Sequence, residues 1–216
     1  MKTYNNNQWD KTYIKKKHIS VWPWNDVIRI IKRKHTHKNK NILELGCGTG
    51  ANIPFFLKEK YKYHGLDFSK TAIKSLKKIY PNLSKKLILT DIMKYEFYNL
   101  NKKFGIILDR GTLTHLEDEK IIELLSKLKK IIDKDSLLIC CSLYCTSNSN
   151  IVKKNRIQHN FTSGIFKNLG YINFFNKRRL VKLFKGWLIV HMEKIVQNDL
   201  LTRTKISYWN IVLKKD

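Results

Sequence analysis

The sequence predicts an α/β fold, a doubly wound and mostly parallel sheet of seven strands with helices on both faces. The first observation is a short apolar run at residues 42–45, of the kind that forms a buried parallel strand. The second is a glycine-rich loop directly after this run, which leads into a helical stretch beginning near Ala51. The third is the alternation of further apolar runs with amphipathic stretches, which is typical of βα units.

Each further element is predicted from its own pattern. Asn25 or Asp26 can cap the first helix, and Ser69 can cap the helix after the second strand. The expected helices cover residues 25–34, 69–79 and 117–132. The expected strands after the first cover residues 61–66, 87–90, 104–108, 137–143, 187–193 and 206–213.

Length and charge limit the classes of protein to consider. A chain of 216 residues is expected to form one domain, residues 1–216, with a sizeable core. The 43 Lys and Arg exceed the 17 Asp and Glu, and a net charge of +26 attracts anions, nucleic acid or acidic membrane. Because the lysines are spread over the whole chain, alongside many Asn and Ile, general compositional bias is the favoured explanation of this charge. The first residues carry no signal-peptide core and no apolar run has membrane-spanning length, so we expect a cytoplasmic protein.

The cysteines do not form two C-x-x-C pairs, as a zinc site would require. We therefore expect no metal site, and reduced thiols in a cytosolic protein. The four residues concerned are Cys47, Cys140, Cys141 and Cys145.

Two polar stretches lie outside the regular alternation. Residues 1–24 are polar with interspersed aromatic residues, among them Trp9 and Tyr13. Residues 145–160 are rich in Ser and Asn and then basic, and a polar stretch of this length in a compact domain is usually functional. We interpret residues 145–171 as a cover over the substrate.

The glycine loop and the end of the second strand together predict a nucleotide-type ligand. Glycines at positions 46, 48 and 50 allow positive φ and let a ligand approach the backbone. Asp67 closes the second strand, where an acid can accept hydrogen bonds from a ribose diol and disfavours a 2′-phosphate. A plain glycine turn or an NAD site would share parts of this pattern.

Glu44 extends the loop pattern to E-L-G-C-G-T-G, which resembles the first motif of the class I methyltransferases that use S-adenosylmethionine. The resemblance covers about residues 25–194. It implies S-adenosyl-L-methionine as the cofactor and the strand order 3-2-1-4-5-7-6, with the seventh strand antiparallel. The segment 174–184 resembles the aromatic residue and helix that these enzymes place before the sixth strand.

The resemblance also implies how the cofactor is held. Amides of the glycine loop would bind the methionine carboxylate, Asp67 the ribose, and Asp91 with its neighbours the adenine. Trp9 and Tyr13 would fold over the cofactor as a lid, or else form an aromatic satellite core. The expected cofactor-binding residues are Trp9, Tyr13, Glu44, Gly46, Cys47, Gly48, Thr49, Asn52, Asp67, Phe68, Ser69, Asp91, Ile92, Met93 and Asp109.

In such enzymes the end of the fourth strand faces the reactive methyl group. The (Asn or Asp)-Pro-Pro-(Tyr or Phe) motif of base-amine methyltransferases is absent here. Asp109-Arg110-Gly111 instead resembles the small-molecule branch, which includes the thiopurine methyltransferases. His115 resembles a histidine common in that branch and is the expected general base, with a capping or packing role as the alternative. Arg110 or Tyr144 would orient the acceptor.

The predicted function is therefore methyl transfer to a small molecule, either an anionic compound or a phosphorylated or nucleotide-linked sugar. One alternative is an RNA methyltransferase, and another is a non-catalytic binding protein with the same fold. The RNA alternative requires one cationic surface formed by Lys153, Lys154, Arg156, Arg178 and Arg179.

Overall fold

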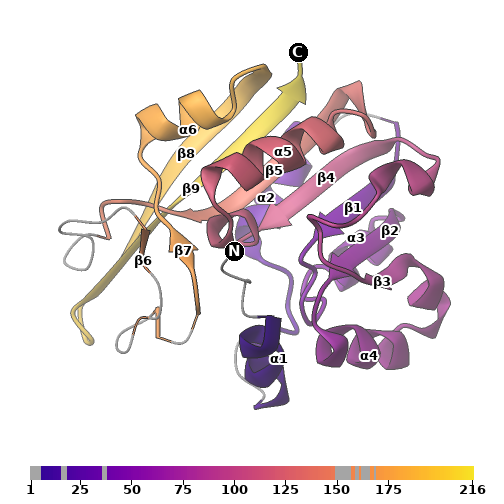
Figure 1. The fold of residues 1–216 in the computed structure, drawn as a ribbon, viewed down its shortest axis with the longest axis horizontal. Helices are drawn as coiled ribbons and strands as arrows, with labels where there is room; N and C mark the ends of the chain where they lie inside the picture. The colour runs from indigo at the N-terminus through magenta and orange to yellow at the C-terminus, as the bar shows by residue number, and fades with distance from the viewer. Residues whose placement is uncertain are drawn as a thin grey trace.

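The computed structural model describes residues 6–15, 19–35, 38–148, 157–158, 161, 166–167 and 169–216. Its main sheet has seven strands in the order β3-β2-β1-β4-β5-β9-β8 (Figure 1). These strands are β1 (Asn41–Leu45), β2 (Lys62–Asp67), β3 (Leu87–Leu89), β4 (Phe104–Arg110), β5 (Ile132–Tyr144), β8 (Trp187–Asp199) and β9 (Thr204–Lys215). Two short strands that the sequence did not predict, β6 (Ile157–Gln158) and β7 (Ile172–Asn173), form a separate sheet.

The predicted fold is confirmed. Counted in chain order without the two short strands, the main sheet has the expected order 3-2-1-4-5-7-6. β1 to β5 are parallel, and β9 is antiparallel to both β5 and β8. The helices are α1 (Asn6–Ile14), α2 (Asn25–Lys34), α3 (Ile53–Lys58), α4 (Lys70–Ile79), α5 (Asp118–Leu128) and α6 (Lys177–Leu183). Short 3-10 turns are η1 (Pro81–Lys86), η2 (Phe97–Leu100) and η3 (Leu113–His115).

Several predicted boundaries differ from the observed ones. The helix expected to reach residue 132 ends at Leu128, and Ile132 already pairs with Phe104 as the first residue of β5. Trp24, and not Asn25 or Asp26, is the N-cap residue of α2, with no side-chain cap. The predicted cap by Ser69 is confirmed, because its hydroxyl accepts a hydrogen bond from the amide of Ala72.

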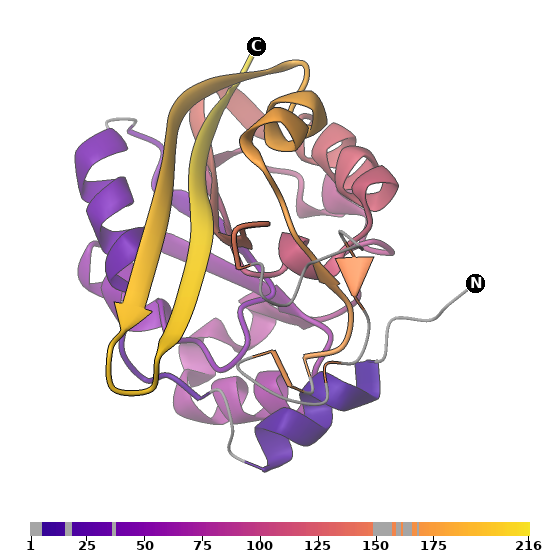
Figure 2. The same cartoon turned by 90° about the vertical axis from the view of Figure 1, so that its left-hand side faces the viewer.

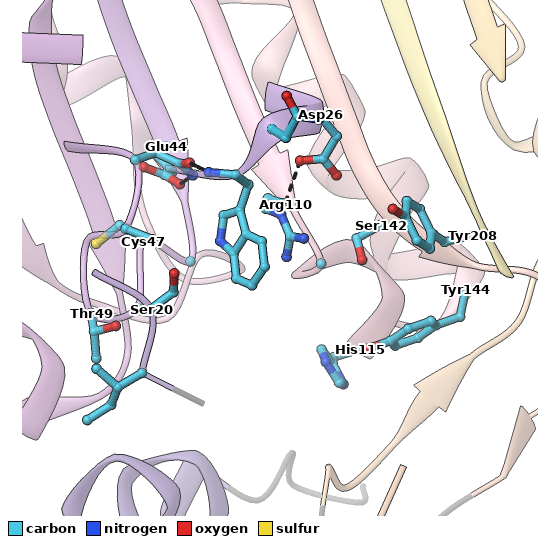
Figure 3. Close-up of a pocket in the computed structure, with 18 of the residues that line it drawn as sticks. Ser20, Asp26, Glu44, Cys47, Thr49, Arg110, His115, Ser142, Tyr144 and Tyr208 are labelled. Atoms are coloured by element: carbon cyan, nitrogen blue, oxygen red, sulfur yellow. Dashed lines mark hydrogen bonds and ion pairs between the residues drawn. The ribbon is translucent and has the colours of Figure 1, made fainter. Parts of the chain in front are cut away.

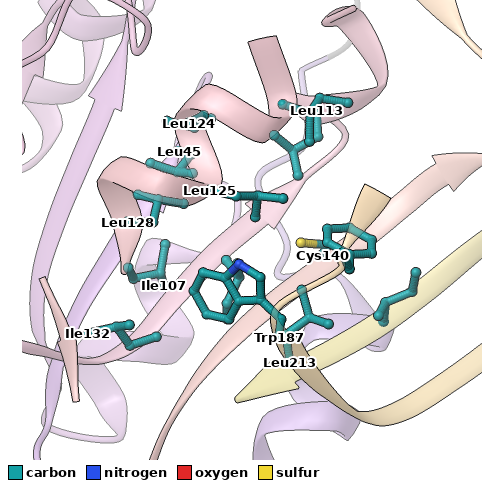
Figure 4. Packing of buried hydrophobic residues seen from close by; sticks show 14 of the residues in the cluster. Leu45, Ile107, Leu113, Leu124, Leu125, Leu128, Ile132, Cys140, Trp187 and Leu213 are labelled. Atoms are coloured by element: carbon teal, nitrogen blue, oxygen red, sulfur yellow. The ribbon is translucent and has the colours of Figure 1, made fainter. Parts of the chain in front are cut away.

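The two faces of the sheet carry separate hydrophobic clusters, as the alternation of side chains along a strand requires. α5 and α6 pack on one face, against Leu138 and Cys140 of β5 (Figures 1 and 4). α2, α3 and α4 pack on the other face, against Leu137 and Ile139 of the same strand. With both faces covered, the free carboxyl ends of the parallel strands are the natural place for a ligand.

A β-bulge interrupts β5 near that end. The register with β9 shifts between Cys140 and Leu143, and Ser142 has a φ of +61°. Cys140 and Leu143 belong to the same cluster, although strict alternation would place them on opposite faces. The bulge therefore reverses the alternation, and Tyr144 lies directly opposite Tyr208 of β9.

The β8–β9 hairpin extends past the end of β5, and Figure 2 shows its two long strands side by side. Away from this hairpin, α1 lies against α4 (Figure 1). In the described part of the chain, no helix is long and apolar enough to cross a membrane, and no group of three or more His, Cys, Asp or Glu is arranged to hold a metal. All four cysteines are buried and free.

Candidate active site

A cavity of about 650 Å³ lies at the carboxyl ends of the central strands (Figure 3). One wall is the loop after β1, and the opposite wall comes from β4, β5 and the β8–β9 hairpin. The residues used below that line it are Trp9, Tyr13, Trp24, Asp26, Glu44, Gly46, Cys47, Gly48, Thr49, Asn52, Arg110, His115, Ser142, Tyr144 and Tyr208.

Two glycines let the loop pass close to its neighbours. Gly46 has a φ of +64°, and a Cβ added there would lie 2.0 Å from Oγ1 of Thr112. Gly48 has a φ of +52°, and its added Cβ would lie 2.8 Å from the hydroxyl of Tyr13. A larger residue at either position would fill space that the loop needs.

The loop amides differ from the expectation. The amide of Cys47 donates to the carbonyl of Leu66 at 3.0 Å, and the amide of Gly48 donates to Oδ2 of Asp67 at 2.8 Å. The amide of Gly50 donates to the carbonyl of Cys47 at 2.9 Å. The prediction that bare amides around Gly48 receive the methionine carboxylate is therefore wrong for these three groups, because they attach the loop to β2.

Asp67 is the centre of this attachment. Its other oxygen, Oδ1, accepts from the amide of Ser69 at 2.8 Å, and the side chain is buried. Burial raises the pKa of Asp67 to about 6. The phenol of Tyr13 lies nearby, and burial with the charge of Asp67 raises its pKa. Each carboxylate oxygen keeps a second lone pair for a ligand, and α1 covers this side of the site.

Glu44 connects the loop to α2. Its Oε1 accepts from Nδ2 of Asn52 at 2.7 Å, and its Oε2 accepts from the hydroxyl of Tyr63 at 2.5 Å. Oδ1 of Asn52 in turn accepts from the amide of Trp24 at 3.1 Å. Burial raises the pKa of Glu44 to about 7. This buried network holds the first residues of α2 against the glycine loop.

The predicted adenine-binding residues lie away from the cavity. Oδ1 of Asp91 accepts from the amide of Met93 at 2.9 Å, which orders the turn after β3. In the described part of the chain the cavity is not lined by Asp67, Phe68, Ser69, Asp91, Ile92, Met93 or Asp109.

Asp109 organises the turn after β4. The side chain is fully buried, and Oδ1 accepts from the amides of Thr112 and Leu113, both at 3.0 Å. Burial raises the pKa of Asp109 to about 7. Its contacts are those of a turn acceptor, and a role in cofactor binding is not supported by this geometry.

His115 is held as a neutral imidazole facing the cavity. Its Nδ1 lies 2.7 Å from the carbonyl oxygen of Tyr171. A carbonyl only accepts, so we assign the proton to Nδ1, which leaves Nε2 as an acceptor. Burial lowers the pKa of His115 to about 4. The ring of Trp9 packs edge-on against the imidazole, with centroids 5.3 Å apart.

Arg110 occupies the middle of the cavity (Figure 3). Its guanidinium carbon lies 3.6 Å from the ring centroid of Trp24, and its Nε lies 3.5 Å from Oδ1 of Asp26. Tyr144 and Tyr208 line the wall beyond it. The sequence did not predict Trp24, Asp26, Ser142 and Tyr208 as site residues, since no motif marks them. The bulge that positions Ser142 and Tyr144 against β9 also has no local signal.

α1 is fastened over the site by Asp10. Its Oδ1 accepts from the hydroxyl of Ser69 at 2.6 Å and from the amide of Thr71 at 2.9 Å. Trp9 of the same helix packs on a small aromatic cluster that includes Phe166 and Phe174. The satellite core that the sequence suggested is therefore present, and Trp9 and Tyr13 also line the cavity.

Most of the predicted substrate cover, residues 145–171, lies outside the described residues, as do Lys153, Lys154 and Arg156. Arg179 is occupied: its Nε and Nη2 donate to the carboxylate of Asp118 at 2.8 and 2.7 Å, and its Nη1 donates to the carbonyl of Phe174 at 2.7 Å. It is therefore not free to bind a phosphate backbone.

Comparison with known proteins agrees with this geometry. Residues 42–135 match the family model described as "Methyltransferase domain". No curated protein matches the chain. The glycine loop lies within the matched segment, together with Asp67 and Asp91.

Solved structures show the same fold. A 1,6-didemethyltoxoflavin-N1-methyltransferase of Burkholderia thailandensis superimposes with a TM-score of 0.74 at 13% identity, over 98% of this chain and 87% of that one. A SAM-dependent methyltransferase of Anabaena variabilis gives 0.70 at 18% identity, over 98% and 93%. TehB of Haemophilus influenzae gives 0.65 at 15% identity, over 96% and 67%. Residues 42–135 are thus similar to a methyltransferase domain, and the solved structures show that the chain has the fold of SAM-dependent methyltransferases.

Proposed function

We propose that this enzyme transfers the methyl group of S-adenosylmethionine to a small molecule that binds in the cavity beside Arg110, and that this acceptor is anionic. The observation that carries the proposal is one cavity lined both by the glycine loop and by Arg110, His115 and Tyr144. A cofactor at the loop and an acceptor beside Arg110 would thus share one space, as in-line transfer requires.

Gly46 and Gly48 both line the cavity, so a ligand bound there would lie against the loop. We assign the cofactor to this loop, to Glu44, Thr49 and Asn52, and to Asp67 under α1. When bound, the cofactor supplies an electrophilic methyl group on sulfur. The protein must then orient the acceptor and exclude water.

His115 is the residue that we place next to the reacting atom of the acceptor. Its Nε2 is the free acceptor, because Nδ1 donates to Tyr171. With a pKa of about 4 the imidazole is neutral at pH 7 and a weak base. We therefore expect it to accept a hydrogen bond from the O–H or N–H that is methylated, and to direct the lone pair of that atom toward the methyl group.

A small acceptor is favoured over RNA for two reasons. Arg179, one of the cations required for an RNA surface, is committed to Asp118 and Phe174. The similar Burkholderia thailandensis enzyme is described with bound 1,6-didemethyltoxoflavin and S-adenosylhomocysteine. A phosphorylated or nucleotide-linked sugar remains one form that an anionic acceptor could take.

The test begins with calorimetry, in which S-adenosylhomocysteine should bind at about one molecule per chain. Cell metabolites are then screened with cofactor labelled in the methyl group. His115→Ala should lower turnover of the acceptor found, with little change in cofactor affinity. Absence of cofactor binding would contradict the proposal, and labelling of RNA in place of metabolites would support the alternative enzyme.

A further inference from the structure

Three hydroxyl groups in the cavity have no hydrogen-bond partner among the residues that the structure describes. They belong to Ser142, Tyr144 and Tyr208, and all three residues line the cavity together with Arg110. Among the residues that the structure describes, neither phenol nor the Ser142 side chain contacts an acceptor. The hydroxyls are open to the cavity, whereas Nε of Arg110 beside them is buried and has no hydrogen-bond partner. Buried polar groups normally have partners, so this set of groups suits a polar ligand.

The sheet brings these groups together. Arg110 at the end of β4 pairs in register with Cys141 of β5, next to Ser142. Tyr144 is directly opposite Tyr208 on β9, so their side chains lie on the same face. Figure 3 shows Ser142, Tyr144 and Tyr208 on one side of Arg110, and Glu44 and Cys47 on the other.

A buried network maintains the bulge that produces this arrangement. The amide of Ser142 donates to Oδ1 of Asn210 at 3.1 Å, and Nδ2 of Asn210 donates to Glu193 at 2.9 Å. Glu193 also accepts from Arg29. A serine at φ +61° costs free energy and persists only where its surroundings hold it. Asn210 is fully buried and provides that support.

Arg110 completes the set of donors. Stacking on Trp24 fixes the plane of the guanidinium. Its Nε lies 3.5 Å from Oδ1 of Asp26, which is too far for a good hydrogen bond. Nε therefore has no hydrogen-bond partner among the described residues. Burial raises the pKa of Tyr144 and of Tyr208, so both phenols stay protonated and can donate. A planar cation and three hydroxyl donors suit oxygen atoms that carry negative charge.

We infer that Arg110, Ser142, Tyr144 and Tyr208 form a subsite for an anionic oxygen group of the methyl acceptor, a carboxylate or a phosphate. This inference rests on the proposed function, because it places that group at the far end of the cavity from the glycine loop. The acceptor would be anchored there by its anion while its reacting atom lies toward His115.

The experiment titrates three probes into protein saturated with S-adenosylhomocysteine: benzoate, phenyl phosphate and the neutral benzamide. Benzoate or phenyl phosphate should bind, the tighter of the two identifying the anion, and benzamide should bind at least tenfold more weakly. Arg110→Gln should weaken anion binding by about tenfold or more, the scale of a lost charge-assisted hydrogen bond. Arg178→Gln is the matched control, since Arg178 is exposed on α6. This variant should bind the anionic probes as wild type does.

Tyr208→Phe, which removes one hydroxyl, is the second variant and tests the inference if Arg110→Gln does not fold. It should bind the anionic probe about threefold more weakly than wild type. The inference is overturned if neither anion binds, if benzamide binds equally well, or if both variants retain anion affinity. The first titration separates the two proposals. Failure of S-adenosylhomocysteine to bind would remove the proposed function and this inference, whereas cofactor binding without anion binding removes only the inference.

Discussion

The two halves of the cavity are built differently. The wall on the β1 side is backbone, a glycine loop attached to β2 by amide hydrogen bonds. The wall on the β5 side is made of side chains, Arg110, Ser142, Tyr144 and Tyr208, which come from three strands and depend on one bulge (Figure 3). A backbone wall constrains which residues can occupy it, whereas a side-chain wall can be changed without moving the chain.

This difference predicts how each half responds to substitution. On the β1 side, which we call the cofactor half after its proposed role, the loop packs against α1 and the turn after β4. Adding a single methyl group to the loop should therefore disturb both the fold and the proposed cofactor site. On the β5 side, which we call the acceptor half after its proposed role, the hydroxyls have no partner among the described residues. Their removal should therefore alter recognition and leave the fold intact. The following predictions test this contrast.

The largest effect is expected for Gly46→Ala compared with Gly111→Ala. Both glycines have positive φ, +64° and +80°, so both variants introduce backbone strain of about 1–2 kcal/mol. Only at position 46 does the new Cβ collide with Thr112, whereas nothing lies within 4 Å at position 111. Urea unfolding should show a loss of about 3–5 kcal/mol for Gly46→Ala and about 1–2 for Gly111→Ala.

Gly111→Ala is thus the matched control for strain without collision. Equal losses in the two variants would mean that the contact with Thr112 does not limit the loop. The cofactor half would then be no more constrained than the acceptor half.

Asp109→Asn tests a buried acid at the junction of the two halves. Its raised pKa, about 7 against 3.8 unfolded, means that the native state holds a proton between about pH 4 and 7 that the unfolded state has released. The stability of the wild type should therefore fall as pH rises through this window. Asn keeps an oxygen that can accept from the amides of Thr112 and Leu113, and it does not titrate. Between pH 4 and 8 the free energy of unfolding of the variant should therefore fall by about 2–4 kcal/mol less than that of the wild type.

Urea unfolding at several pH values measures this difference, and S-adenosylhomocysteine affinity is measured in parallel. Parallel stability curves for wild type and variant would show that Asp109 does not titrate as described. A large loss of cofactor affinity would restore the predicted role of Asp109 in cofactor binding.

The main elements of the fold follow from the sequence because their patterns are local. The apolar run before Gly46, the cap at Ser69 and the parallel strands at residues 104–108 and 137–143 all appear at the expected places. The predicted helix end was wrong, because Ile131 and Ile132 continue the helical apolar spacing, whereas the helix ends at Leu128 and Ile132 pairs with Phe104 of β4. The short pair β6–β7 has no pattern long enough to predict.

The sequence predicts the residues on the β1 side of the cavity better than those on the β5 side. The glycine loop, Glu44 and Asp67 lie close together, as the motif predicts, and their role in cofactor binding stays a prediction. Tyr208 was not predicted, since its position depends on a register that only the bulge in β5 sets. Free loop amides were also wrongly expected, because a sequence does not show that Asp67 is used to hold Gly48.

Asp67→Ala should reduce affinity for S-adenosylhomocysteine by about 1–3 kcal/mol, which is about 5- to 150-fold. The variant removes the acceptor of Gly48 and Ser69 as well as the proposed partner of the ribose. Ser142→Ala, in the acceptor half, is the control and should bind the cofactor as wild type does. Calorimetry measures both, and unchanged affinity in Asp67→Ala would remove this residue from the cofactor site.

The smallest effect is expected for Asp10→Ala, which releases α1 from α4. The hydrogen bond from Ser69 lowers the pKa of Asp10, so at pH 7 a carboxylate accepts from the start of α4, and its loss should cost about 0.5–1 kcal/mol. The hydroxyl of Tyr13 on α1 lies close to Gly48. If α1 is held less tightly in the variant, the association rate of S-adenosylhomocysteine should rise a few-fold, as measured by stopped-flow fluorescence. Lys11→Ala, at an exposed position of the same helix, should leave the rate unchanged. An unaltered rate in Asp10→Ala would mean that the cofactor enters past the β5 side of the cavity, and that the backbone wall is not gated by α1.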